Sequence, residues 1–192
     1  MGRAASVDEA EIATRLGEVF RASGYAGASL SALSEAAGLQ RASLYHRFPS
    51  GKPAMAAAVL DSVEHELESV LQPLASGRDV AGGVAEMARR MAHSYRDGRM
   101  ACVLDTMTLA GAPQDVKDQA ARLAGKWIEA MAGAAVRAGA TEAEATGVAR
   151  AALVRIEGAL VVARVLDDPS VFHQALSELP GLLAPDRHTT TA

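Results

Sequence analysis

The fold of the amino-terminal part of the chain is decided by nine residues, Gln40-Arg-Ala-Ser-Leu-Tyr-His-Arg-Phe48. Leu44 and Phe48 stand four positions apart, so a helix places both on one face and leaves a polar face opposite. Gly38 comes shortly before, and glycine readily adopts the left-handed backbone of a sharp turn. Ser29 is suited to cap the start of another short helix before that turn. The sequence therefore predicts two short helices joined by a tight turn.

The polar face of the second short helix has the composition of a surface that could enter the major groove of DNA. Arginine can donate paired hydrogen bonds to guanine, hydroxyl groups can donate to phosphates, and alanine lets the backbone approach closely. The side chains on this face are Arg41, Ala42, Ser43, Tyr45, His46 and Arg47. Helix packing with no further role is the alternative interpretation of such a pair.

Charge gives a mixed answer on DNA binding. Residues 1–72 hold six basic and nine acidic groups, a net charge of −3, which argues against a basic DNA-binding domain. Residues 21–52 hold four basic groups and one acidic group, Glu35. Positive charge is thus concentrated around the second short helix, where the local potential matters most.

The whole chain is expected to be all-α, because alanine dominates it and aromatic residues make up only 4%. Helix-breaking residues predict about nine helices, over residues 8–22, 29–37, 40–48, 53–72, 80–96, 100–109, 114–139, 141–166 and 170–183. We expect a helix-turn-helix module over residues 1–51, a helical bundle over 52–184 in which helix 52–72 bridges the two parts, and a disordered tail over 185–192.

Composition excludes several classes of protein. The formal charge is −4 and the hydrophobic fraction is 49%, as in an ordinary globular protein. The single cysteine, Cys102, cannot form an intrachain disulfide, and we expect a buried structural role for it, with a redox-sensing thiol as the alternative. The scattered histidines predict no metal site, and nothing indicates a cofactor. Neither a signal peptide nor a membrane span is expected, so the expected location is cytoplasmic.

The run from Ala13 to Leu60 resembles the helix-turn-helix domain of TetR-type transcriptional regulators. The resemblance is carried by Phe20, Gly24-Tyr25, Ser29-Leu-Ser-Ala-Leu33, Ala36-Ala-Gly38, Ser43-Leu-Tyr45, Phe48 and Lys52. The run Leu-Tyr-His-Arg-Phe-Pro-Ser-Gly-Lys52 and the stretch from Gly98 to Cys102 resemble more narrowly the YxaF/LmrA-like branch. The resemblance implies that Ser29, Ser43, Tyr45, His46 and Lys52 hold phosphates, while Gln40, Arg41, Ala42 and Arg47 face bases. Arg47 stands where relatives often have histidine, so its assignment between base and phosphate stays open.

A homodimer is expected, because each short helix reads only a few base pairs and specific binding needs two copies ~34–36 Å apart, or a multiple of that. The last two expected helices carry apolar stripes that could pair across a two-fold axis, formed by Leu153, Ile156, Leu160, Ala163, Phe172, Leu176, Leu179 and Leu183. Periodicity alone fits an intramolecular core equally well. Among them, the charged residues Arg155, Glu157 and Arg164 form either a solvated edge or paired charges.

The middle helices carry a methionine-rich stripe. Methionine fills irregular space and repacks easily, which suits a pocket for a small molecule, although such stripes more often belong to a core. The candidate lining residues are Met87, Met91, Tyr95, Leu104, Met107, Leu123, Trp127 and Met131.

The function expected from these features is that of a homodimeric repressor without enzymatic activity. Its partners would be a double-stranded, palindromic operator and a small apolar or amphipathic effector that releases the protein from it. Two alternatives remain open at this point: an all-α ligand-binding or cofactor-binding protein or enzyme that does not bind DNA, and a helical module that binds another protein.

Overall fold

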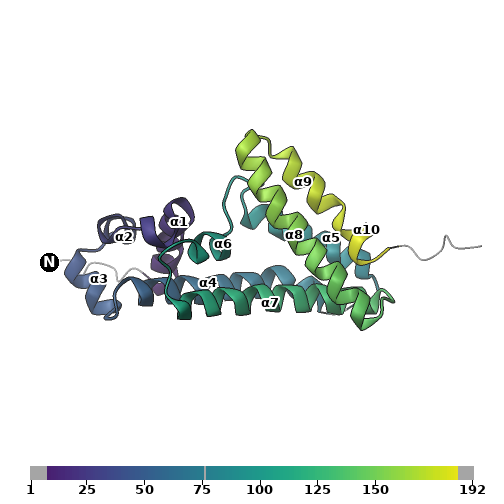
Figure 1. Cartoon of the computed structure of the whole chain (residues 1–192), viewed down its shortest axis with the longest axis horizontal. Coiled ribbons are helices and arrows are strands. Elements are labelled where there is room, and N and C mark those ends of the chain that lie inside the picture. Colours follow the sequence, from purple (N-terminus) through teal and green to yellow (C-terminus); the bar gives the residue numbers. More distant parts are fainter. Residues whose placement is uncertain (1–7, 76, 186–192) are drawn as a thin grey trace, which may run out of the picture. The chain divides into compact units, whose positions relative to one another are not determined.

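The computed structural model describes residues 8–75 and 77–185, and the regular elements among these residues are all helices, which confirms the expected fold class (Figure 1). Its elements are α1 (Glu9–Gly27), α2 (Leu30–Ala37), α3 (Arg41–Arg47), α4 (Lys52–Leu71), the 3₁₀ turn η1 (Gln72–Leu74), α5 (Val80–Ser94), α6 (Val103–Thr108), α7 (Gln114–Arg137), α8 (Glu142–Leu166), α9 (Ser170–Ser177) and α10 (Leu179–Leu183). The expected tail lies outside the described residues from position 186 onward.

The chain divides into two compact units. The first unit comprises the residues up to His65 together with Val103–Arg122, and the second comprises Glu66–Cys102 together with the residues from Leu123 onward. This division groups α6 and the start of α7 with the amino-terminal helices, because α6 packs against α1. Linear sequence gave no sign of this grouping, since more than seventy residues separate the two helices.

The core of the first unit is formed by the apolar stripe of α1. Ile12, Leu16 and Phe20 recur at helical spacing and are fully buried. α1 does not stop before Gly24 as expected but continues to Gly27 with a break at Gly24, whose φ of 68° and ψ of 176° are not helical. The break turns Tyr25 inward, where its ring stacks on Phe20 with centroids 6.0 Å apart. The kink therefore adds an aromatic residue to the core beneath the short helices.

The turn between α2 and α3 is held by both its backbone and a buried side chain. Gly38 ends α2 in the left-handed conformation with φ of 64°. The backbone N–H of Leu39 donates to the carbonyl of Ser34 at 3.1 Å, and the Ser34 hydroxyl donates to the carbonyl of Leu39. Ser34 is buried, and the bond from its hydroxyl is partly buried. The turn thereby fixes the direction in which α3 leaves α2.

The second unit is built around α8, which packs along α9 and α10 (Figure 1). Thr141 begins α8 with a capping box, in which its side chain and that of Glu144 each accept a backbone N–H. The helix expected over 170–183 is interrupted at Glu178, because Pro180 has no N–H to continue the hydrogen-bond ladder. The interruption lets Phe172, Leu179 and Leu183 all reach the core of this unit.

Replacement of Gly24 with alanine is expected to lower the free energy of unfolding by about 1–3 kcal/mol, because its backbone conformation is essentially restricted to glycine. A Cβ at this position would also lie 3.2 Å from the carbonyl oxygen of Thr106. Urea denaturation measures the change. Gly125→Ala on α7 is the control, since a Cβ there meets nothing within 4 Å, and it is expected to stabilise by about 1 kcal/mol. Equal effects of both substitutions would show that the kink at Gly24 carries no strain.

Candidate nucleic-acid interface

The polar face of α3 is exposed, and its apolar face is buried. Leu44 and Phe48 are 1% and 5% exposed, which confirms that these two side chains anchor the helix to the core. The side chains of the polar face are all exposed: Gln40, Arg41, Ala42, Ser43, Tyr45, His46 and Arg47. Seven neighbouring side chains that can contact a groove or a backbone are thus brought together on one short, fixed element.

Arg41 is linked to the preceding helix through its side chain. Its guanidinium donates a hydrogen bond to the hydroxyl of Ser31 on α2. A guanidinium has five N–H donors in a planar fork, so one bond to Ser31 leaves others for the edge of a base. Ser31 was not among the candidate DNA-binding residues, because the spacing of residues along α2 does not indicate which of them contact α3. The contact orients Arg41 before any partner binds.

Ser29 caps the start of α2. Its Oγ accepts a hydrogen bond from the backbone N–H of Ala32 at 3.1 Å, and the residue is exposed. The Oγ acts here as an acceptor, so its own O–H proton can still be donated to another group such as a phosphate. The capping role expected of Ser29 is confirmed, and its contact with a phosphate stays a prediction.

Lys52 has a different environment from the one expected. Its ammonium donates to the carbonyl oxygens of Tyr25, Ala26 and Ala28 at 2.9, 3.4 and 3.3 Å, and it lies 4.7 Å from the centroid of the Tyr25 ring. An ammonium has three N–H donors, and three carbonyls occupy them. Lys52 therefore ties the start of α4 to the end of α1 rather than offering donors to a phosphate. The sequence did not predict this role, because every residue has a backbone carbonyl and residue type therefore does not show which carbonyls accept hydrogen bonds from Lys52.

Tyr25 responds to the same enclosed environment. Burial raises the pKa of its hydroxyl above the usual value, and the negative charge of Asp115 adds to the effect. The tyrosine is therefore neutral at physiological pH, and its ring serves as an uncharged surface under the Lys52 ammonium.

The eight residues of the methionine-rich stripe are mostly enclosed. Seven of them are at most 9% exposed, and Tyr95 is half-buried. Leu104 and Met107 belong to the first unit, and the other six belong to the second. Trp127 carries an unusual feature, because its indole Nε1–H is buried and finds no hydrogen-bond partner among the described residues. The hydroxyl of Tyr95 donates to Sγ of Cys102 at 3.5 Å, and Cys102 is buried as expected.

Most of the residues expected at a dimer face are buried within the single chain. Leu153 is half-buried, and the other seven, from Ile156 to Leu183, are at most 4% exposed. Their surface is used up by packing of α8 against α9 and α10, so it is not available to another subunit. Of the charged residues among them, Arg155 pairs with Glu178, and Arg164 donates to the carbonyl of Met100 at 3.2 Å.

A second stripe of α8, which sequence reasoning did not single out, is exposed instead. It runs along the helix in alternating steps of four and three residues and consists of Gly147, Ala151, Val154, Gly158, Val161 and Val165. Val154 and Val165 are 72% and 76% exposed, which is high for valine. The spacing of this stripe can be seen in the sequence. Because it contains glycine and alanine, it is less hydrophobic than the stripe that forms the core, and it was not predicted to be an interface.

Two family models match the chain. "Bacterial regulatory proteins, tetR family" matches residues 10–59, and "Transcriptional regulator LmrA/YxaF-like, C-terminal domain" matches residues 79–178. The chain belongs to the TetR family of regulators. The helix-turn-helix described above lies inside the first match, and α5 to α9 lie inside the second. The chain is therefore a TetR-family DNA-binding transcriptional regulator.

Solved structures share the TetR fold over nearly the whole chain. A TetR transcriptional regulator from Legionella pneumophila is 17% identical with a TM-score of 0.81, covering 92% of this chain and 97% of its own. SCO4454 from Streptomyces coelicolor is 19% identical with a TM-score of 0.77, covering 93% and 97%. A cysteine variant of CifR in complex with 26-bp operator DNA is 23% identical with a TM-score of 0.71, covering 92% and 98%. No curated protein sequence matches the chain.

Two kinds of feature are absent from the described residues. None of the helices there combines the length and apolar character that crossing a membrane requires. Within residues 8–75 and 77–185, no three His, Cys, Asp or Glu side chains gather in a way that could hold a metal ion.

Replacement of Lys52 with methionine is expected to lower the free energy of unfolding by about 1.5–3 kcal/mol, because it removes a charged donor from three carbonyl oxygens. Urea denaturation followed by circular dichroism measures the change. Lys117→Met on α7 is the matched control, with an expected change below about 0.5 kcal/mol. A Lys52→Met variant that keeps its stability but binds every DNA sequence more weakly would instead assign the ammonium to a phosphate.

Proposed function

We propose that this TetR-family regulator is a homodimeric repressor that binds a palindromic operator and leaves it when a small molecule binds the second unit. The observation that carries the proposal is α3, whose Leu44 and Phe48 are buried while seven polar-face residues are exposed. A helix held in this way can enter a major groove without rearranging. The repressor role follows from the family resemblance rather than from the geometry.

The side chains of α3 divide between bases and phosphates in this proposal. Gln40, Arg41, Ala42 and Arg47 face base edges, and Ser29, Ser43, Tyr45 and His46 face the sugar-phosphate backbone. Arg41 is the residue best placed to specify sequence, because Ser31 already orients its guanidinium and a guanidinium can bond guanine at two positions. Lys52 does not contact DNA in this proposal, and its hydrogen bond to the carbonyl of Tyr25 holds the end of α1 against the start of α4.

The exposed stripe of α8 is the proposed dimer face. Its small residues, Gly147, Ala151 and Gly158, would allow two copies of α8 to approach closely, while Val154, Val161 and Val165 supply apolar area. An isologous interface brings the same stripe of both subunits together, so six positions provide twelve contacting side chains or backbones. The proposed dimer face therefore lies on the same helix as the one expected from the sequence, but on its exposed stripe instead of its buried stripe.

The effector is proposed to bind among the buried residues of the second unit, where Met87, Met91 and Met131 can repack around it. The unpaired indole N–H of Trp127 favours an effector with a hydrogen-bond acceptor, because a buried donor without a partner costs about 1–3 kcal/mol. Moving the operator-competent fraction from 99:1 to 1:99 requires the effector to discriminate between the two states by ~5.5 kcal/mol.

The Arg41→Ala variant is expected to lose about 1–3 kcal/mol of operator-binding free energy while its thermal denaturation stays unchanged. Operator fragments selected from genomic DNA, titrated in a gel shift at fixed salt, measure the loss. Arg78→Ala, which removes the same charge from an exposed position in the second unit, is the control and should bind as the wild type does. Equal losses in both variants would mean that Arg41 contributes only to net charge.

The Gly158→Arg variant is expected to be a folded monomer. A Cβ at this position meets nothing within 4 Å in a single chain, but a charged side chain on the proposed two-fold face would keep the two copies apart. Light scattering after size exclusion should give the mass of one chain for this variant and of two for the wild type.

Gly125→Arg on α7 is the matched control for the oligomeric state, because a Cβ there is equally unobstructed. It should remain dimeric. A monomeric wild type, or a Gly158→Arg variant that stays dimeric, would remove α8 as the dimer face.

A further inference from the structure

Ser31 and Arg41 form a side-chain hydrogen bond across the turn between α2 and α3. Ser31 is the second residue of α2, and Arg41, ten positions later, is the first residue of α3. The two helices pack against each other, and backbone and side-chain bonds at Ser34 and Gly38 hold the turn between them. Ser31 is therefore held in place relative to α3. Both side chains are exposed, so a partner that approaches α3 can reach them.

The bond to Ser31 leaves Arg41 able to donate two parallel hydrogen bonds. A guanidinium offers two pairs of parallel N–H groups, one formed by Nε and Nη2 and the other by Nη1 and Nη2. Ser31 accepts from Nη2, which contributes one hydrogen to each pair. Whichever of these hydrogens the bond uses, the other pair remains complete. Because guanine presents two acceptors, O6 and N7, in the major groove, the remaining pair can still bond both of them.

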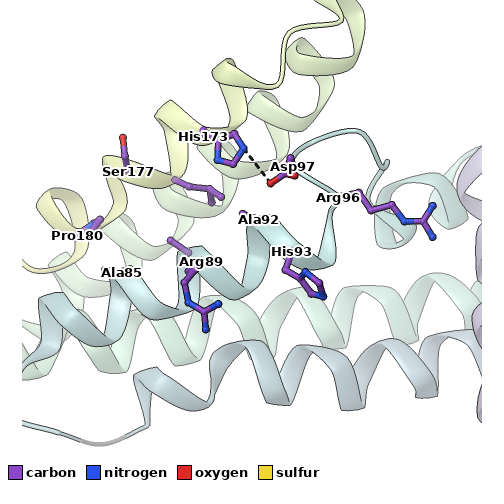
Figure 2. A pocket seen from close by; sticks show the side chains of 11 residues that line it. Ala85, Arg89, Ala92, His93, Arg96, Asp97, His173, Ser177 and Pro180 are labelled. Carbon is purple, nitrogen blue, oxygen red and sulfur yellow. Dashed lines mark ion pairs between the residues drawn. The ribbon is translucent and has the colours of Figure 1, made fainter.

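Arg89 on α5 shows the effect of a different kind of partner. It stands beside the groove between α5 and α9 that Figure 2 shows. Its guanidinium donates two hydrogen bonds of 2.7 Å to the carboxylate of Glu86, and these bonds are the largest cause that lowers the pKa of Glu86 to about 2. Glu86 is therefore ionised at physiological pH, and its negative charge offsets that of Arg89. An arginine paired in this way is poorly suited to hold an anion.

Arg41 has a neutral partner instead. Glu35 is the one carboxylate in residues 21–52, and the described residues include no ion pair between Glu35 and Arg41. A hydroxyl accepts a hydrogen bond without contributing a formal charge, so the guanidinium keeps its full positive charge for the phosphates and bases of DNA. Ser31 therefore fixes the orientation of Arg41 and leaves its charge uncancelled, and a side chain that reads DNA requires both.

We propose that Ser31 is a positioning residue that makes this regulator select guanine at one position of each operator half-site. It acts through Arg41 and does not itself contact the base. Without the bond, the long side chain of Arg41 has to be ordered when DNA binds, which costs about twofold to tenfold in affinity. This role rests on the proposed function, in which α3 enters the major groove, and it adds to that function the base that is read and a residue outside α3 on which the reading depends.

Operator DNA in which each guanine of one half-site is replaced in turn by 7-deazaguanine locates the base that Arg41 reads. The replacement removes the N7 acceptor and keeps the Watson–Crick pairing. The operator is a fragment selected from genomic DNA by the wild-type full chain, and binding is titrated in a gel shift at fixed salt. At one guanine, the wild type should lose about tenfold in affinity, whereas the Arg41→Ala variant should be insensitive to the replacement.

The Ser31→Ala variant tests the positioning role, because it removes the hydroxyl and leaves every charge in place. It should bind the operator about twofold to tenfold more weakly than the wild type and bind DNA of unrelated sequence equally well. Replacement of the identified guanine by 7-deazaguanine should cost this variant only about threefold. Ser31→Thr retains a hydroxyl and should restore the wild-type values. Ser69→Ala, at an exposed serine of α4 in the second unit, is the matched control and should bind as the wild type does.

Combination with Arg41→Ala separates the positioning role from any effect that Ser31 has by itself. In the Arg41→Ala background, Ser31→Ala should weaken binding no further. Unchanged operator binding by Ser31→Ala, an equal loss on unrelated DNA, or an equal loss in the Arg41→Ala background would overturn the proposal. Tighter operator binding would also overturn it, since Ser31 would then keep Arg41 away from the base. A wild type that selects an operator but is insensitive to every 7-deazaguanine would overturn this proposal alone, and one that selects no DNA fragment would overturn the proposed function as well.

Discussion

The burial of Leu44 and Phe48 is the interaction on which the amino-terminal unit depends. α3 has seven residues, which is too short for a helix to be stable in water by itself. Each of the two side chains is almost completely buried and contributes about 1.5–3 kcal/mol of hydrophobic stabilisation. The helix therefore exists because it is anchored, and the same anchoring holds its polar side chains outward. Removal of either apolar group would remove the recognition surface together with the helix.

Groups that need not touch DNA set the position of this anchored helix. Ser34 and Gly38 fix the turn before it, and Lys52 ties the following helix to the carbonyls at the end of α1. Ser31 orients Arg41 from the neighbouring helix. An interface that is ordered before binding loses less conformational entropy when a partner arrives, so these supporting bonds contribute to affinity without contacting the partner.

The second unit depends on α8 having two apolar faces with different composition. Ala152, Ile156 and Leu160 on one face fit closely against α9 and α10. Val154, Val161 and Val165 on the other face stay exposed. Packing within a chain favours the larger, continuous stripe, while small exposed residues suit the close approach of a second helix.

The sequence alone determined that the chain is helical, where its amino-terminal turn lies, and which face of α3 is buried. These features are local, because helix periodicity, capping and the backbone freedom of Gly38 act over a few neighbouring residues. Only the tertiary structure decided which stripe of α8 stays exposed. It also decided the role of Lys52, whose shortest hydrogen bond is to the carbonyl of Tyr25, 27 residues earlier in the chain. It alone also brought His173 on α9 to Asp97, 3.2 Å away. Such outcomes depend on contacts between segments far apart in the chain, for which residue type and spacing along one helix carry no signal.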